Sequence, residues 1–442
     1  STYQAPMTTN QVGSFNIAIG SGVLRLANEN DNDGSVGIGY GALNNQAGTG
    51  GAQFANATVG IGYKALTALT TGAANTAVGY QSGASLVDGN QNSIFGYNAG
   101  YSLTEGLDNT AMGYGALYAE NDGDYCVAIG SLALNSQTGV SGAVRNTALG
   151  YKAGYAVTTG VRNVIIGTDA AVGMQDADEC VIIGNYAMAA NATQDGTIAI
   201  GRSALAALTS GANNVAVGYQ ALYTATELDK NTAIGYQALK VASGSAGYTG
   251  NTAVGYQAGV AVTTAITNTL IGASSGLALT TGGQNVIIGA SAGSTSTAAY
   301  QMVIIGKSAA GGGNITAAAL GSIAIGVAAL SGLTSGAANL AIGWEALKVH
   351  TTGARNIAIG EKAMNDTNAG STSLGSIDNI FVGVDAGGGT WADAASNYNV
   401  GIGSNVMDAA MNGALGNTAL GYNTLSSVTE GDYNVAIGYN TG

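Results

Sequence analysis

The chain has 442 residues, of which 72 are Gly and only one is Pro, and charged residues make up 8% of it. Its net charge of −13, with 12 Lys and Arg in total, argues against a nucleic-acid partner, because phosphate binding requires clustered basic residues. No apolar run approaches the ~18 residues of a membrane-spanning helix, so we expect no membrane insertion.

A phrase of the type Asn-Thr-Ala-Val-Gly-Tyr, as in residues 251–256, recurs along almost the whole chain. It has 24 copies, with central glycines at positions 20, 39, 62, 79, 96, 113, 130, 150, 167, 184, 201, 218, 235, 255, 272, 289, 306, 326, 343, 360, 383, 403, 421 and 438. Of the 23 spacings, 15 are 17 residues and four are 20 residues. A short fixed period is typical of a solenoid, in which each coil buries its apolar face by stacking on its neighbours.

We therefore predict an all-β parallel β-solenoid, of the β-roll or β-helix type, with about 24 coils centred on Gly20 to Gly438. The repeats predict a single continuous domain over residues 1–442, with an insertion-rich distal region at 361–416. The near absence of Pro fits coils that donate backbone hydrogen bonds to both neighbours.

Each repeat contains a predicted strand that ends at the glycine. The residue directly before the glycine is aliphatic, Met or Phe in all 24 copies, and the residue three before it is Val, Ile, Leu, Thr or Ser. Because side chains alternate along a strand, these two residues share one face, which we predict to point into the coil, as for Ile234 and Val254. The residue two before the glycine is also never polar, so the opposite face is predicted to be buried against another copy of the chain. A closed three-fold fibre also removes exposed sheet edges, so the sequence predicts a homotrimer.

The glycine at the end of the strand is never replaced. This predicts a turn with positive φ or a backbone packed against the next coil, as at Gly235, Gly255, Gly272 and Gly289. Four residues earlier stands Asn in 17 of the 24 copies, which predicts an Asn ladder along the stack, as for Asn231 and Asn251.

Cys126 and Cys180 occupy this Asn column, three coils apart. At ~4.8 Å per coil they would be ~14 Å from each other, which is too far for a disulfide.

Tyr follows the glycine in 11 copies, for example at Tyr236 and Tyr256. In ten of these copies the residue two before the glycine is small, whereas larger residues there are mostly followed by a residue other than Tyr. This anticorrelation predicts that the two side chains fill one volume.

The longer spacings add residues at one predicted corner of the coil, in segments 44–57, 135–145, 240–250, 310–321, 365–378 and 388–398. Insertions collected on one edge of a solenoid are where binding surfaces usually arise. Trp391 and Tyr398, in the last of these segments, are the candidates for receptor contact; the alternative is that the insertions are ordinary surface loops.

Phrases such as Asn231 to Leu239 and Asn434 to Tyr439 carry a family likeness. They resemble the Asn-Ser-Val-Ala-Ile-Gly repeats in the heads of trimeric autotransporter adhesins, and they look even more like the repeats of bacteriophage tail and side fibres. The resemblance covers essentially the whole chain and implies a trimeric parallel β-roll. The 17-residue period is longer than adhesin heads usually show, and no stalk, membrane anchor or signal peptide is recognisable, which favours a phage fibre.

Residues suited to chemistry are sparse. Asp31 and Asp33 are weak candidates for calcium binding, since hard cations favour clustered carboxylates, but solvated turns are the simpler interpretation. Gly306-Lys307-Ser308 ends like a phosphate-binding loop, yet position 301 is Gln where that motif requires Gly. His350 is the single histidine, in a position that elsewhere holds Leu or Val, which excludes a His-based triad and a His-rich metal site. We predict no catalytic residues, no cofactor and no enzymatic activity.

The sequence thus predicts a structural fibre protein on the surface of a virion, a phage tail or side fibre that serves as a rigid rod and host-receptor adhesin. Its expected partners are its own copies, other fibre or baseplate proteins at the ends, and a host surface glycan or protein receptor. The alternative is a trimeric adhesin on a bacterial cell surface or an extracellular matrix filament. Ice binding by a flat array of threonines is a weaker hypothesis, because the paired threonines are adjacent in the sequence and so point to opposite faces of a strand. A polysaccharide depolymerase would require paired carboxylates in a cleft.

Overall fold

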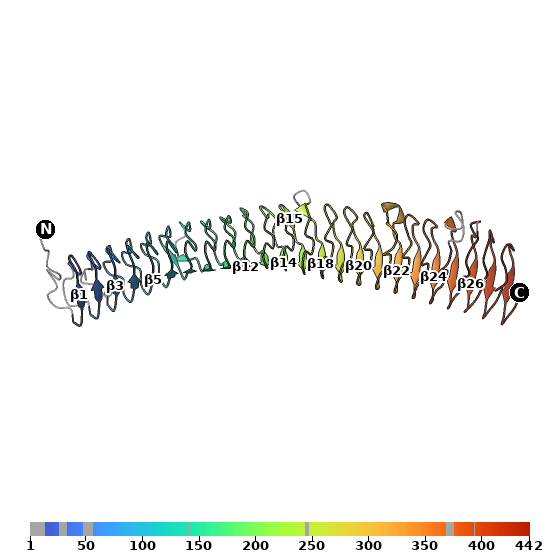
Figure 1. The fold of residues 1–442 in the computed structure, drawn as a ribbon, viewed down its shortest axis with the longest axis horizontal. Helices are drawn as coiled ribbons and strands as arrows, with labels where there is room; N and C mark the ends of the chain where they lie inside the picture. Colours follow the sequence, from blue (N-terminus) through green and yellow to red (C-terminus); the bar gives the residue numbers. More distant parts are fainter. Residues whose placement is uncertain are drawn as a thin grey trace. The chain divides into compact units, whose positions relative to one another are not determined.

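The computed structural model describes residues 14–25, 33–46, 56–138, 142–243, 247–367, 375–392 and 394–442. The fold is an all-β parallel β-solenoid of about 23 turns with ~17-residue spacing and almost no helix, as the repeat predicted. The chain divides into two compact units, residues 1–214 and 215–442, which are described separately below. Figure 1 shows the strands and the N- and C-termini.

In unit 1, each coil contributes one three-residue strand to a parallel sheet, and each strand pairs in register with the strand of the next coil, as Val78 does with Phe95. The strands are β1 (Ile17–Ile19), β2 (Val36–Ile38), β3 (Val59–Ile61), β4 (Thr76–Val78), β5 (Ser93–Phe95), β6 (Thr110–Met112), β8 (Val127–Ile129), β10 (Thr147–Leu149), β11 (Val164–Ile166), β12 (Val181–Ile183) and β13 (Ile198–Ile200). Two further short strands, β7 (Gly123–Asp124) and β9 (Gly142–Ala143), pair in parallel with each other.

Unit 2 repeats this arrangement. Its sheet strands are β14 (Val215–Val217), β16 (Thr232–Ile234), β18 (Thr252–Val254), β19 (Thr269–Ile271), β20 (Val286–Ile288), β21 (Val303–Ile305), β22 (Ile323–Ile325), β23 (Leu340–Ile342), β24 (Ile357–Ile359), β25 (Ile380–Val382), β26 (Val400–Ile402), β27 (Thr418–Leu420) and β28 (Val435–Ile437). A second short pair consists of β15 (Leu228–Asp229) and β17 (Gly247–Tyr248), and one 3-10 turn, η1, spans Ala317–Ala319.

The interior of the coil lies on the opposite side of the strand from the one that the sequence predicted. The inner strand column, defined as the residue two before each repeat glycine, is buried in every coil except the first and the last, as for Ala77 and Ala233. The outer strand columns, one and three residues before the glycine, face outward: Ile234 is 39% exposed and Val254 is half-buried. The predicted orientation was therefore wrong. A narrow coil has room for alanine inside, and β-branched residues suit a pleated, half-buried surface.

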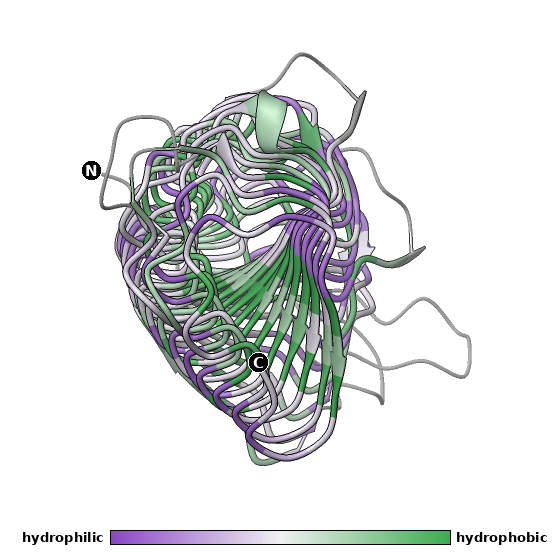
Figure 2. Cartoon of the chain, turned by 90° about the vertical axis from the view of Figure 1, so that its right-hand side faces the viewer, coloured by the Kyte–Doolittle hydropathy of each residue, from purple (hydrophilic) through white to green (hydrophobic). Residues whose placement is uncertain are grey.

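Figure 2 looks along the stack of coils and shows that the strands consist mostly of hydrophobic residues, while the rest of each coil mixes hydrophilic and hydrophobic ones. The sequence predicted that both faces of the strands are buried, and the face that lacks cover within the chain is the one formed by the outer strand columns.

Most large residues in the inner strand column are accommodated by Gly or Ala four positions after the glycine, where most coils have a buried Leu or Met; Ile182, with Met188, is the exception. Leu270 is followed by Gly276, and Phe381 by Gly387. A Cβ added to Gly276 would lie 3.1 Å from Leu270 Cδ2, and one added to Gly387 would lie 2.9 Å from Phe381 Cδ1. The volume is therefore shared between these two interior positions. The predicted exchange with the Tyr column was wrong, because those tyrosines lie outside the coil.

The turn after each strand explains why its glycine is never replaced. Gly255 has φ +140°, and a Cβ there would lie 2.5 Å from the carbonyl oxygen of Gly272 in the next coil. Two residues further on, Gln257 is also left-handed, with φ 52°. This conformation costs roughly 1–2 kcal/mol for a non-glycine residue, and it is supported by the Gln257 N–H donating to the Tyr236 carbonyl at 2.8 Å.

The predicted Asn ladder is present inside both units. In unit 2, the backbone N–H of Asn251 donates to Asn231 Oδ1 at 3.0 Å, and Asn251 Nδ2 donates to the Ala265 carbonyl at 2.8 Å. The same pattern joins Asn92 to Asn75 in unit 1. Because these side chains are buried, each amide bonds the coil before it and the turn of its own coil, which satisfies polar groups that water cannot reach.

Candidate functional surfaces

The largest candidate surface is the outward face of the sheet in each unit, formed by the outer strand columns. The residue directly before each glycine is apolar in every copy, and several are substantially exposed. In unit 1 these include Met112 at 41% and Leu149 at 46%, and in unit 2 Ile271 at 38% and Ile402 at 43%. No copy has a charged residue in either outer column. An exposed apolar strip of this kind is a candidate interaction surface.

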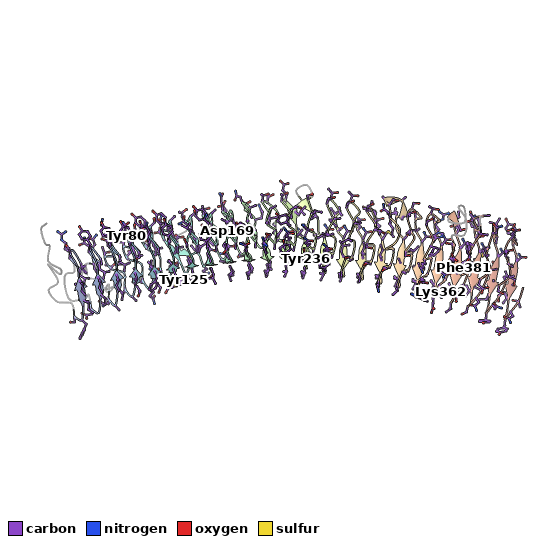
Figure 3. The ribbon with its side chains drawn as sticks, viewed as in Figure 1. Tyr80, Tyr125, Asp169, Tyr236, Lys362 and Phe381 are labelled. Carbon is purple, nitrogen blue, oxygen red and sulfur yellow. The ribbon has the colours of Figure 1, made fainter. Side chains whose placement is uncertain are left out.

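A column of tyrosines lies directly after the strands. The described rings stack from coil to coil with centroids 4.8–5.5 Å apart. The stacked runs are Tyr40–Tyr63–Tyr80–Tyr97–Tyr114 in unit 1 and Tyr219–Tyr236–Tyr256 and Tyr422–Tyr439 in unit 2. Tyr236 is 42% and Tyr256 54% exposed, and Figure 3 labels Tyr80 and Tyr236 among the side chains that line the coils. Since the ring faces are mostly occupied by neighbouring rings, an uninterrupted stretch of the stack presents edges and hydroxyl groups.

A ladder of glutamines accompanies the tyrosines in unit 2 and was missed in the sequence. Gln237 Nε2 donates to Gln220 Oε1 at 3.0 Å, and Gln257 Nε2 donates to Gln237 Oε1 at 3.0 Å. The signal was the recurrence of Gln two residues after the glycine, which indicates a half-buried, hydrogen-bonded ladder once the coils are known to stack in register.

Several Asp side chains that precede the strands join neighbouring coils. Asp33 Oδ1 accepts from the Ser14 N–H at 2.6 Å, Asp124 Oδ1 from the Leu107 N–H at 2.8 Å, and Asp178 Oδ1 from the Val161 N–H at 2.7 Å. Asp31, the other calcium candidate, lies outside the described residues. Within the described ranges, no three His, Cys, Asp or Glu side chains form a group that could hold a metal ion.

The two receptor-contact candidates differ in their environments. Trp391 is fully buried: its ring packs edge-on against Phe381 with centroids 6.0 Å apart, and its Nε1 donates to the Gly387 carbonyl at 3.0 Å. Trp391 is therefore a core residue, and its prediction as a receptor-contact residue was wrong. Tyr398 is 55% exposed and lies near the ion pair of Arg355 with Asp378.

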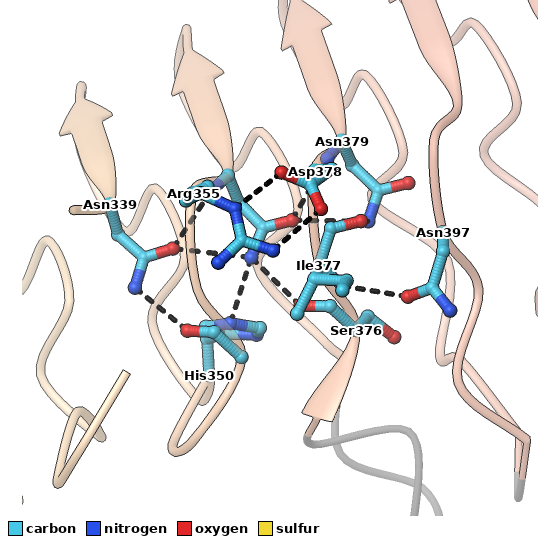
Figure 4. Close-up of polar contacts among 10 residues, drawn as sticks. Asn339, His350, Arg355, Ser376, Ile377, Asp378, Asn379 and Asn397 are labelled. Atoms are coloured by element: carbon cyan, nitrogen blue, oxygen red, sulfur yellow. Dashed lines mark hydrogen bonds and ion pairs between the residues drawn. The ribbon is translucent and has the colours of Figure 1, made fainter. Parts of the chain in front are cut away.

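Figure 4 shows this ion pair above a buried polar cluster in unit 2. Arg355 Nε and Nη2 donate to the two carboxylate oxygens of Asp378, both at 2.7 Å. The guanidinium lowers the pKa of Asp378 below its ordinary value.

Beneath the pair, His350 is completely buried, with Nδ1 3.1 Å from Thr367 Oγ1 and Nε2 3.1 Å from Asn356 Nδ2. Burial lowers the pKa of His350 to about 4, so the ring is neutral at pH 7. The ring is an enclosed neighbour of the Asn ladder, through its contact with Asn356.

Unit 1 contains a buried carboxylate. Glu120 Oε1 accepts from the backbone N–H groups of Asn121 and Gly123, both at 2.9 Å, and burial raises the pKa of Glu120. Cys126 lies in the same interior and is a free thiol, as is Cys180. Burial raises the pKa of both thiols to about 11, which makes them poor nucleophiles.

The threonines that suggested a hydroxyl array are engaged within the stack. Thr158 Oγ1 donates to the Gln175 carbonyl at 3.3 Å and Thr263 Oγ1 to the Thr280 carbonyl at 3.0 Å. Because these hydroxyls donate to carbonyl groups of the next coil, they are less available to bind the surface of an ice crystal.

No family model matches the chain, and no curated protein or solved structure matches it either. The described part of the chain has no helix with the length and apolarity to span a membrane.

Proposed function

We propose that the chain is a non-enzymatic structural fibre protein, displayed on a virion as a tail or side fibre, that assembles as a homotrimer through the outward face of its sheet and holds a host-binding surface away from the particle. The observation that supports this proposal is the uncharged, mostly aliphatic and partly exposed strip that the outer strand columns form in both units.

The most suitable occupant of this strip is a second copy of the same chain. Coils follow one another at ~4.8 Å, so a partner must have the same rise to keep its side chains in register. The insertions leave this rise intact: Ile129 pairs in register with Leu149 although 20 residues separate them. A sister chain therefore provides a matching strip along its whole length, and a three-fold arrangement lets every chain cover its strip against the others.

The energy of such an interface is sufficient only when many coils take part. Covering one half-exposed aliphatic side chain contributes about 1 kcal/mol, while association costs roughly 4–15 kcal/mol of lost translational and rotational freedom. A short stretch of coils would not hold together, whereas ten or more coils would, so assembly is expected to be cooperative along the fibre.

The experiment is the mass of the assembled particle, measured by light scattering after gel filtration. We expect three chains for the unmodified protein and a shift toward single chains for Ile234→Lys combined with Ile271→Lys, which places charges in the strip. Ser291→Lys is the matched control, because Lys152 and Lys362 occupy the equivalent position after their glycines. A stable single chain for the unmodified protein would overturn the proposal.

A further inference from the structure

Two hollows on the surface of unit 1 lie beside the Tyr40–Tyr114 stack, one near each end. The first has a volume of about 260 Å³ and is lined by Asn98, Tyr114, Gly115, Tyr118, Leu132 and Asn135. The second has about 250 Å³, and its lining includes Gly22, Arg25, Tyr40, Gly41, Asn44 and Lys64.

Both hollows arise from the same feature of the sequence. Two residues after the repeat glycine, most coils have a side chain such as Gln81 or Asn98, but three copies have Gly, namely Gly22, Gly41 and Gly115. These three glycines line the two hollows. The missing side chain opens the groove between the Tyr column and the residues five positions after the repeat glycine.

The hollow at Gly115 is bordered by two aromatic rings that each end a stack. Tyr114 stacks on Tyr97 at 5.5 Å and Tyr118 on Tyr101 at 5.3 Å. The next coil has Ser131 and Asn135 at these two columns, so no further ring covers either stack. Consistent with an uncovered face, Tyr114 is 57% exposed, compared with 41% for Tyr80 within the stack.

Polar groups border the same hollow without bringing charge. Asn135 Nδ2 donates to the Gly115 carbonyl at 2.9 Å, which holds its amide across the floor. Asn98 Oδ1 is buried and has no hydrogen-bond partner, although buried acceptors normally have one. The phenol hydroxyls add groups that both donate and accept.

We propose that the hollow at Gly115 is a binding subsite for one uncharged sugar ring of a surface glycan. A pyranose ring has an apolar C–H face that packs on an aromatic ring and hydroxyl groups that pair with phenol and amide groups, which is the combination that Tyr114, Tyr118 and Asn135 provide. The volume lies just below the roughly 300–1,000 Å³ of sites for larger small molecules, so it suits a single ring with the rest of the polymer outside.

The hollow at Gly41 has the same construction and a different charge. Asn44 Oδ1 is again a buried acceptor without a partner, and Tyr40, at the other end of the stack, is again 57% exposed. Of the described residues that line it, Arg25 and Lys64 are cationic and none is acidic. The same reasoning assigns it a sugar ring that carries a carboxylate or sulfate group. This subsite assignment rests on the host-binding part of the proposed function.

The test uses the full chain and saturation-transfer NMR with a panel of probes: the methyl glycosides of glucose, galactose, mannose and N-acetylglucosamine, and glucuronic acid as the anionic probe. Gly115→Gln fills the hollow. Gln is compatible with the backbone there, because Gly115 has φ 58° and Gln257 adopts φ 52° at the equivalent position. A Cβ at Gly115 would meet only the side-chain ends of Leu132, at 3.1 Å, and Asn135, at 3.3 Å. Ser291→Gln, at the same position in unit 2, is the control.

We expect transfer to at least one neutral glycoside, a loss of at least tenfold in affinity in Gly115→Gln, and no change in Ser291→Gln. Gly41→Gln is expected to reduce binding of glucuronic acid selectively. Absence of transfer to every neutral glycoside, or equal binding by Gly115→Gln and the unmodified chain, would overturn the assignment; attachment to host cells in that case would point to a protein receptor.

The mass measurement separates this inference from the fibre proposal. If the chain is a monomer but binds a glycoside, and Gly115→Gln weakens that binding, the subsite inference stands and the fibre proposal is wrong. If the chain is a trimer but binds no glycoside, the fibre proposal stands and the subsite inference is wrong.

Discussion

Replacing Asn268 by Ala tests whether the Asn ladder holds the coils together. The buried side chain makes four hydrogen bonds: Nδ2 donates to Asn251 Oδ1 and to the Gly282 carbonyl, both at 3.1 Å, and Oδ1 accepts from the backbone N–H of Asn285 at 3.1 Å and from its Nδ2 at 2.9 Å. Each bond contributes about 0.5–1.5 kcal/mol net, so Asn268→Ala is expected to cost about 3–4 kcal/mol.

Serine provides a graded comparison, because Ser322 already occupies this column. Its Oγ donates to the Gly336 carbonyl at 3.2 Å and accepts from the Asn339 N–H at 3.2 Å, which corresponds to two of the four bonds. Asn268→Ser should therefore cost about half as much as Asn268→Ala, and the outward Thr269→Ala less than ~1 kcal/mol.

The assay is native-state hydrogen exchange of the amides in the two coils that flank the substitution, because a repeat protein opens locally and a single unfolding transition is not assured. A cost below ~1 kcal/mol for Asn268→Ala, or equal costs for Ala and Ser, would refute a structural role for the ladder.

Three further measurements address the interior. Ala111→Ile should destabilise its coils by about 1–3 kcal/mol through overpacking, and adding Leu117→Gly should recover part of this loss, as judged by denaturant unfolding; no recovery would contradict the shared volume. His350 has a folded-state pKa of about 4, below its ordinary 6.5, so its coil should lose up to ~3 kcal/mol as the pH falls from 6.5 to 4, and His350→Leu should abolish that part of the pH dependence in hydrogen exchange. Cys126 and Cys180 should resist an aromatic disulfide reagent at pH 8 until the protein is unfolded, and rapid labelling of the native chain would show that the interior is open.

The period and the in-register stack could be predicted because they depend on one strongly spaced residue. A glycine that no copy replaces fixes the turn, and the Asn four residues before it repeats with the same spacing, so the ladder of Asn231 and Asn251 followed directly. Both features arise from backbone geometry, which sequence spacing reports well.

The direction of the strand faces was not predictable by the same means. Alternation over three residues separates Ala233 from Ile234 but does not say which of them lies inside. Preference for large residues in a core suggested Ile234, whereas the narrow coil admits Ala233 and leaves room for Leu239, which is buried four residues after the glycine. The width of the coil depends on the conformation of all its turns, so it could not be predicted from the residues at any one position of the repeat.

Trp391 was misplaced for a related reason. An aromatic residue inside an insertion suggests a surface loop, but the Trp391 ring packs edge-on against the buried Phe381 and donates to the Gly387 carbonyl. One signal was available in Gly387, four residues after the repeat glycine, where the missing side chain makes room for the large inner residue Phe381.

Strand pairing in register across coils of unequal length, as between Ile129 and Leu149, has a consequence for how such genes change. Duplication or loss of one whole repeat would leave every remaining contact of the described kind in place, because each coil bonds only the coil before and the coil after it. A shift of one residue within a strand would instead exchange inside for outside. Related proteins with this architecture should therefore differ in length by whole repeats, while the position of each residue within a repeat stays the same.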